Sequence, residues 1–174
     1  AFPYHLGVSA HPKVDAKTGE LLFFNYSKEA PYMKYGVVDE NNDLVHYVDV
    51  PLPGPRLPHD MVFTENYVIL NDFPLFWDED LLRKGIHHPR FHPHIPSRFA
   101  VIPRRGSTED IRWFEADPTF VLHFPNAYED GDEIVLDDEM KAGVATGFSS
   151  RLQQNVKMAA ASAVHRSDTV NELN

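Results

Sequence analysis

Short apolar segments separated by turn-forming residues fill the first three quarters of the chain. These segments are rich in β-branched and aromatic residues, a composition that favours β-strands. Turn-forming sequences such as DAKTGE, DENND and EDGDE stand between them. The pattern predicts strands over residues 21–27, 32–38, 44–50, 66–73, 97–103, 111–116, 119–124 and 132–137.

Proline narrows the fold class that these strands can build. The chain contains 14 prolines, all between residues 3 and 125. A proline inside a helix removes a hydrogen bond and clashes with the preceding turn. Long crossover helices are therefore not expected here, which argues against a parallel α/β sheet. The fold class that we predict is all-β, with a sandwich, a barrel or a propeller as the alternatives.

The last part of the chain has a different pattern. Residues 149–164 contain no proline, are rich in alanine and carry apolar residues at helical spacing. This pattern predicts a helix or an irregular tail. We therefore divide the chain into a β-rich part at residues 1–140 and a helical or irregular segment at residues 141–174.

Composition restricts the partners and the chemistry. The formal net charge of −10 repels phosphate groups, so nucleic acid is not an expected partner. The chain has no cysteine, which leaves imidazole and carboxylate as the available metal ligands. No apolar run reaches the roughly 18 residues of a membrane span, and the N-terminal segment lacks the pattern of a signal peptide. We expect a protein that is not secreted and, because the first residue is not Met, one that extends further upstream.

One stretch is conspicuously rich in histidine. The sequence GIHHPRFHPHIPSR at residues 85–98 holds four of them: His87, His88, His92 and His94. A histidine-rich tract can bind metal, but the interspersed prolines prevent any regular element from bringing four rings to one point about 2.1 Å from an ion. We predict an exposed loop, with a role as a lid or as a weak metal scavenger left open.

Three other histidines stand within or beside apolar segments. They are His11, His59 and His123, separated by 48 and 64 positions. Such distances exclude a local chelate like a zinc finger or a helical H-E-x-x-H motif. A buried imidazole in the core and a metal ligand both remain open, since only the fold could bring the three together.

Several stretches around these histidines resemble the carotenoid cleavage oxygenase family. They are AHPKVDAKTGELLFFNYS, the long segment that contains LPHDMVFTENYVILNDFPL, RFAVIPRRG, and IRWFEADPTFVLHFPNAYEDGDEIVLD, in the order that the family has them. The resemblance covers roughly residues 7–137 and ends after Asp137. Its three histidine motifs are specific in combination and weak one by one.

The resemblance implies a fold and a metal site. The family fold is a seven-bladed β-propeller with Fe(II) on its axis, held by four histidines. His11, His59 and His123 match three of these ligands, whereas the fourth has no counterpart because His165 stands in a different context. The glutamates that orient the family's ligands also have no match, and we interpret Glu129 as a turn residue.

The resemblance also implies an activity and its partners. The expected reaction inserts both atoms of dioxygen across a conjugated carbon–carbon double bond and releases two carbonyl products. The partners would be an apolar polyene or a stilbene-like substrate, together with dioxygen. The protein would be located in the cytoplasm or a plastid, with peripheral contact to a membrane. The segment NDFPLFWDEDLL at residues 71–82 would form a tunnel mouth or a membrane-facing patch, unless it is ordinary core packing. The missing fourth histidine favours the alternative of an inactive propeller fragment with a binding or structural role.

Overall fold

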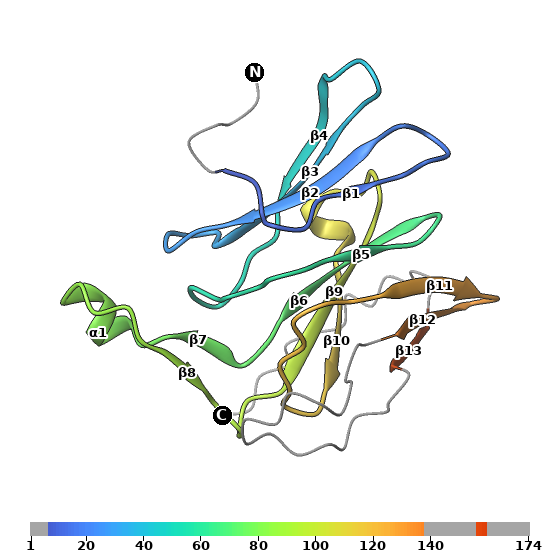
Figure 1. The fold of residues 1–174 in the computed structure, drawn as a ribbon. Helices are drawn as coiled ribbons and strands as arrows, with labels where there is room; N and C mark the ends of the chain where they lie inside the picture. The colour runs from blue at the N-terminus through green and yellow to red at the C-terminus, as the bar shows by residue number, and fades with distance from the viewer. Residues whose placement is uncertain (1–6, 138–155, 160–174) are drawn as a thin grey trace, which may run out of the picture.

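The computed structural model describes residues 7–137 and 156–159. The described part is mostly β-strand, which confirms the all-β prediction (Figure 1). Its strands are β1 (Lys13–Val14), β2 (Leu21–Tyr26), β3 (Met33–Val38), β4 (Leu44–Asp49), β5 (Val62–Phe63), β6 (Tyr67–Asp72), β7 (Leu75–Trp77), β8 (Pro89–Phe91), β9 (Ser97–Pro103), β10 (Arg112–Ala116), β11 (Asn126–Asp130), β12 (Glu133–Asp137) and β13 (Val156–Ala159). A short helix α1 (Glu79–Arg83) and a 3-10 turn (Thr108–Asp110) complete the described elements.

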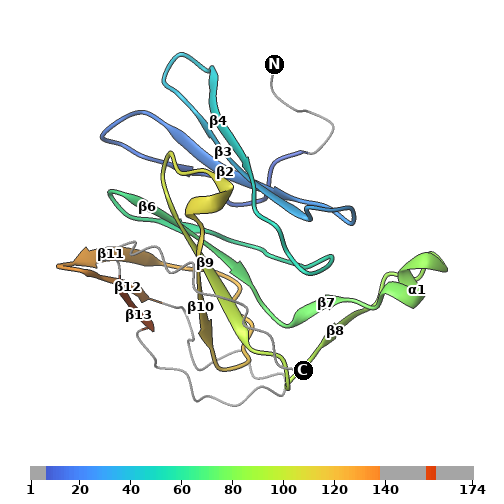
Figure 2. The same cartoon turned by 180° about the vertical axis from the view of Figure 1, so that it is seen from behind.

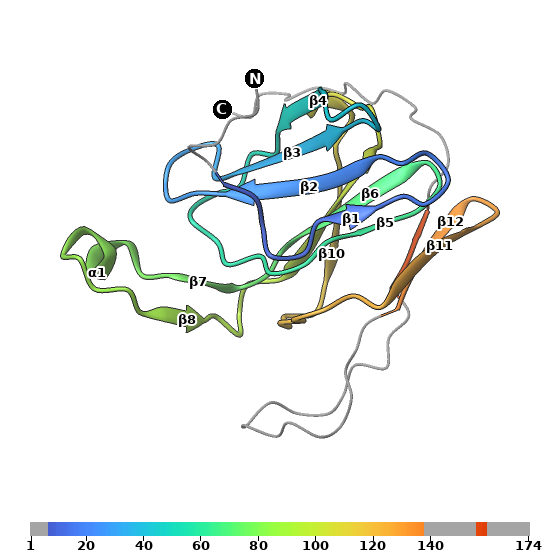
Figure 3. The ribbon, with the colours of Figure 1, turned by 45° about the horizontal axis from the view of Figure 1, so that its top comes forward.

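Three antiparallel sheets are built in the same way. The first has the order β1-β2-β3-β4, the second β5-β6-β9-β10 and the third β11-β12-β13. Each sheet starts with an edge strand and adds the next strands of the chain outward, except that the β7–β8 hairpin interrupts the second sheet. Figure 3 shows the sheets following one another in chain order. The described strands do not close into a ring, so the propeller stays a prediction.

Most of the predicted strands are present, and the errors have local causes. Seven predicted segments contain β2, β3, β4, β6, β9, β10 and β12. The prediction at 119–124 is wrong, because this segment is irregular between Pro118 and Pro125 and the strand β11 begins only after the second proline. Sequence patterns missed the short strands β1, β5, β7 and β8, which carry too few residues for an alternating pattern.

A helix or an irregular tail was predicted at residues 149–164, and both are wrong for the part that the structure describes. Val156–Ala159 forms the strand β13, paired antiparallel with β12. The remainder of that segment lies outside the described residues. Alanine-rich composition favours a helix only weakly, and pairing to an existing strand edge can override it.

The central strands of the second sheet, β6 and β9, are buried on both faces, so this sheet packs between the first and the third. Alternate side chains of β6 and β9 point to opposite faces. Val68 and Leu70 pack toward the first sheet, in a core with Leu22, Phe24 and Tyr35. The intervening side chains of the same two strands pack toward the third sheet, in a second core: Ile69, Phe99 and Val101 with Phe124, Ile134 and Leu136. Burial of each large apolar side chain contributes about 1.5–3 kcal/mol, so the relative placement of neighbouring sheets rests mainly on these cores.

Arg104 also connects the first two sheets. This residue directly follows β9. Its guanidinium forms ion pairs with Asp15 at 2.6 Å and with Glu20 at 2.7 Å, both in the turn between β1 and β2. Arg105 pairs with the other oxygen of Glu20. The hydrogen bond from Arg104 is the largest cause that lowers the pKa of Asp15 below its usual value.

We expect Arg104→Gln to lower the melting temperature by about 5 °C at pH 7. Because Asp15 has a lowered pKa in the folded state, its contribution is complete above the unfolded-state pKa of about 3.9 and is lost as the pH falls through the folded-state pKa. The difference between the variant and the unchanged protein should therefore shrink below about pH 4. Thermal unfolding followed by circular dichroism from pH 3 to 7 measures it. A difference that is constant over this range would contradict the role of Asp15.

Candidate metal centre

The three separate histidines occupy equivalent places in the three sheets. His11 lies just before β1, His59 just before β5 and His123 just before β11. These are the edge strands with which the sheets begin, and β11 contacts β5. Because the sheets follow the same plan, the residue before each edge strand arrives at the same region. The fold thus supplies the convergence that spacings of 48 and 64 positions in the sequence leave open.

Prolines flank the three histidines and favour extended backbone around them. Pro12 follows His11, Pro58 precedes His59, and Pro125 comes two residues after His123. A proline disfavours helical backbone in the residue before it and offers no N–H for a strand ladder. The segments are accordingly irregular at the histidines and enter their strands only afterwards.

The three imidazoles lie close enough to bind one ion. The Nε2 atoms of His11 and His59 are 2.9 Å apart, and one ring nitrogen from each of the three residues lies within 4.8 Å of the other two. Ring centroids are separated by 4.6 to 5.2 Å with steep interplanar angles. Two nitrogens at 2.1 Å from an ion and at right angles lie about 3.0 Å apart, close to the shortest separation seen here. Within residues 7–137 and 156–159, this is the group of histidine, aspartate and glutamate side chains that could hold a metal.

The environment of His59 favours its neutral form, which is the form that binds metal. Burial, followed by the neighbouring His11 and His123 rings, lowers the pKa of His59, while the Asp60 carboxylate acts in the opposite direction. A neutral imidazole offers a free lone pair and needs to lose no proton when it binds an ion. All three rings are half-buried, so an ion at this place would be reachable and not sealed into the core.

The histidine-rich stretch does not form a second centre. His87, His88 and His94 are exposed, as predicted for a surface loop, although the strand β8 interrupts that loop. The His92 ring stacks on Phe76 at a centroid distance of 4.0 Å. None of these four joins a cluster of ligand atoms within the described part of the chain.

The segment at residues 71–82 divides between core and surface. Phe73 is buried in the second core, as the core-packing alternative predicts. Leu75–Trp77 forms β7, which pairs with β8 and leads to α1. Together β7, α1 and β8 form an arm that projects from the sheets (Figure 2). Whether this arm borders a substrate path stays a prediction.

The interpretation of Glu129 as a turn residue is wrong. It lies in β11, and its carboxylate accepts hydrogen bonds from the Thr64 hydroxyl at 2.6 Å and from the Asn66 backbone N–H at 2.8 Å. These bonds lower the pKa of Glu129 against the opposing effect of burial. The residue ties the third sheet to the turn between β5 and β6, a contact that no sequence pattern indicates.

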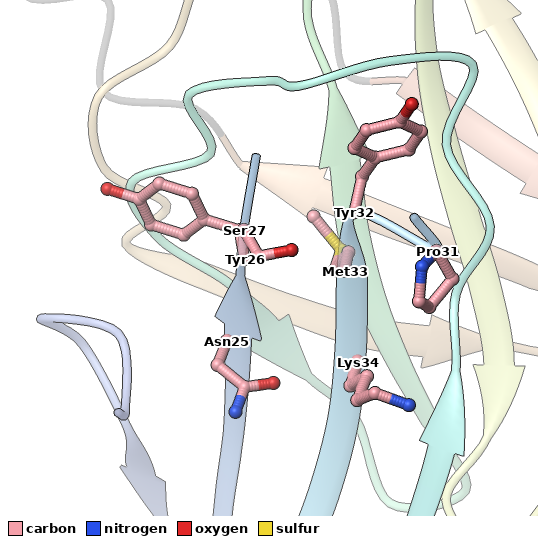
Figure 4. Close-up of a pocket in the computed structure, with 7 residues that line it drawn as sticks. All are labelled: Asn25, Tyr26, Ser27, Pro31, Tyr32, Met33 and Lys34. Atoms are coloured by element: carbon pink, nitrogen blue, oxygen red, sulfur yellow. The ribbon is translucent and has the colours of Figure 1, made fainter. Parts of the chain in front are cut away.

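A small pocket lies at the end of the β2–β3 hairpin, and none of the three clustered histidines lines it. Figure 4 shows it with Met33 between the rings of Tyr26 and Tyr32. Its volume of about 20 Å³ is enough for a water molecule and far too small for a polyene. It is therefore not a substrate site.

Comparison with known proteins identifies the family. The model of the RPE65 family (retinal pigment epithelial membrane protein) matches residues 2–171. The chain belongs to the carotenoid cleavage oxygenase (RPE65) family. This confirms the resemblance carried by the three histidine motifs.

Named relatives and a solved structure agree with the family. The chain is 38% identical over 130 residues to carotenoid 9,10(9',10')-cleavage dioxygenase 1 of Pisum sativum, which covers 74% of this chain and 24% of that protein. It is 34% identical over 137 residues to resveratrol cleavage oxygenase 1 of Aspergillus fumigatus, covering 76% of this chain and 28% of that protein. The crystal structure of Pseudomonas brassicacearum lignostilbene dioxygenase matches with a TM-score of 0.69 at 32% identity, over 75% of this chain and 28% of that chain. The chain thus spans about a quarter of the length of the relatives it matches.

Proposed function

We propose that this chain contributes the iron-binding part of a non-haem Fe(II) oxygenase that cleaves a conjugated carbon–carbon double bond to two carbonyl products. The observation that supports the proposal most directly is the convergence of three half-buried imidazoles from three separate sheets. Membership of the cleavage oxygenase family supports the same reaction class.

The donor set fits ferrous iron. Imidazole is a good ligand for iron, and three neutral donors leave the full charge of a divalent ion uncompensated at the site. When bound by His11, His59 and His123, Fe(II) would supply the centre at which dioxygen is activated. The chain's own task is to hold these rings in place, and burial of His59 favours the neutral form of that ring. A fourth histidine, outside the matched motifs, would complete the set that the family resemblance implies.

The relatives' names support a substrate class for this proposal. Carotenoid, resveratrol and lignostilbene each denote a molecule with a conjugated carbon–carbon double bond between unsaturated groups. We propose a substrate of this kind, a carotenoid, an apocarotenoid or a stilbene, with dioxygen as the second reactant. In this proposal the three sheets are blades of the seven-bladed propeller that the resemblance implies.

The cellular location is a proposal as well. We propose the cytoplasm or a plastid, with peripheral contact to a membrane through which an apolar substrate arrives. Of the helices in the described part, none has the length and apolar character needed to cross a bilayer.

Reconstitution of the full-length protein with Fe(II) under nitrogen tests the proposal. We expect about one iron per protein by emission spectrometry, and consumption of dioxygen with formation of two carbonyl products in a panel of carotenoids and stilbenes. Iron bound without turnover of any member would leave the alternative of an inactive binding module. No iron bound at all would refute the metal centre.

A further inference from the structure

One buried carboxylate contacts the segments that carry all three histidines. Asp60 is 2% exposed. Its Oδ1 forms an ion pair with Lys13 Nζ at 2.7 Å and accepts a hydrogen bond from the Met61 backbone N–H at 2.7 Å. Its Oδ2 accepts a hydrogen bond from the Phe124 backbone N–H at 3.0 Å.

The partners of Asp60 are neighbours of the histidines in sequence. Lys13 comes two residues after His11, Asp60 directly follows His59, and Phe124 directly follows His123. Asp60 is itself held from the second sheet, because the Asn71 side-chain amide donates a hydrogen bond to its backbone carbonyl at 2.8 Å. The carboxylate therefore fixes the three histidine segments relative to one another at the point where they converge.

We propose that Asp60 is the positioning residue that sets the mutual geometry of His11, His59 and His123 for metal binding. This inference rests on the proposed function, since it concerns the same centre. Asp60 acts through the backbone and through Lys13, and it does not need to touch the ion. Its two oxygens are occupied by the three bonds just described, and the group of ligand atoms close enough to share an ion does not include it.

The chemistry of the contact requires a carboxylate. A buried charge is tolerated only when it is paired and hydrogen-bonded, and Lys13 together with two backbone N–H groups provides these partners. An asparagine offers one accepting oxygen in place of two. It therefore cannot serve Lys13 and Phe124 from opposite sides, and it turns an amide N–H₂ toward one of these donors. The Asp60→Asn substitution keeps the shape of the side chain and breaks the connection between the segments.

Glu129 offers a matched control for this substitution. It is also a carboxylate that ties the β5–β6 region to the third sheet, through Thr64 and Asn66. It lies six residues beyond His123 in sequence, and the Asn126-to-Glu129 part of β11 alone spans roughly 10 Å. Glu129→Gln removes a carboxylate that also connects two sheets. It leaves unchanged the segments before β1, β5 and β11, in which the three histidines lie.

The test is a titration of the full-length protein with Co(II) under nitrogen, using the visible absorption of the bound ion as a signature of its ligand geometry. We expect Asp60→Asn to weaken Co(II) binding about 10–100-fold, the loss in affinity found when groups that orient metal ligands are removed. We also expect the substitution to shift the visible spectrum of the bound ion. Glu129→Gln should lower the melting temperature while leaving the affinity and the spectrum unchanged.

Each other outcome has a definite meaning. Equal affinity and spectrum in Asp60→Asn and the unchanged protein would overturn this inference and leave the proposed metal centre intact. Equal losses in Asp60→Asn and Glu129→Gln would overturn it too, because a general loss of packing would then explain both. Absence of Co(II) binding to the unchanged protein would overturn the proposed centre and this inference together.

A second variant decides the matter if Asp60→Asn does not fold. Lys13→Met removes the partner on the His11 side and keeps the two backbone N–H donors of the Asp60 carboxylate, although loss of the counter-charge also lowers stability. Weakened Co(II) binding with a shifted spectrum would support the positioning role. Unchanged binding in Lys13→Met would overturn it.

Discussion

His59→Ala is expected to abolish the proposed iron binding and the proposed oxygenase activity of the full-length protein. The substitution removes one of three convergent imidazoles. Its Nε2 atom lies 2.9 Å from the Nε2 atom of His11, so an ion at the cluster would lose a ligand. Loss of a group that merely orients a ligand weakens metal binding about 10–100-fold, so loss of the ligand itself should exceed about 100-fold. Iron content by emission spectrometry and dioxygen consumption with the best substrate of the panel measure the effect.

His92→Ala provides the control for this loss. His92 belongs to the histidine-rich stretch, stacks on Phe76 and takes no part in the three-histidine cluster. We expect the variant to keep its iron and its activity. Equal iron content in His59→Ala and His92→Ala would contradict the assignment of His59 as a ligand.

The sequence indicated the three histidines of the candidate centre, but it did not indicate the sheets and the buried carboxylate that hold them together. His11, His59 and His123 stand out because each is a polar residue among apolar ones and each matches a family motif. Their convergence depends on three sheets built to the same plan, a property of tertiary structure that spacing along the chain does not contain. The contacts of Asp60 that suggest its proposed role were missed because their partners lie 47 and 64 positions away, although a carboxylate directly before the apolar run of β5 was a visible signal.

The fold was predictable where the local pattern and the tertiary environment agree. β2, β6 and β9 are long enough to show their composition, and each packs into a core that needs it. The two-residue strands β1 and β5 owe their existence to pairing with a neighbour, since two residues carry no period. The strand at Val156–Ala159 has a helix-favouring composition and pairs with β12 all the same.

Asp72→Ala is expected to lower the free energy of unfolding by about 3 kcal/mol, because breaking a buried ion pair leaves its partners without a counter-charge. The Asp72 side chain is 5% exposed and pairs with Arg56 at 2.6 Å and with Arg98 at 2.5 Å. Arg56 in turn lies over the Phe76 ring at 4.0 Å, at the base of the arm formed by β7, α1 and β8. Removing the carboxylate leaves two guanidinium groups poorly solvated and frees the residue that anchors the arm. Urea unfolding followed by fluorescence measures the loss.

Asp49→Ala is the matched comparison for the Asp72 prediction. Asp49 pairs with Lys34 but its side chain is 51% exposed, so solvent replaces the lost partner and the expected cost is about 0–1 kcal/mol. The arm gives a second measurement: limited proteolysis should cut near α1 faster in Asp72→Ala than in Asp49→Ala, because only the first change releases Arg56 from its ion pair. If the two variants lose equal stability, burial of the Arg56–Asp72–Arg98 cluster does not determine its contribution, and the anchoring of the arm must come instead from the backbone bridge between Arg56 and Phe76.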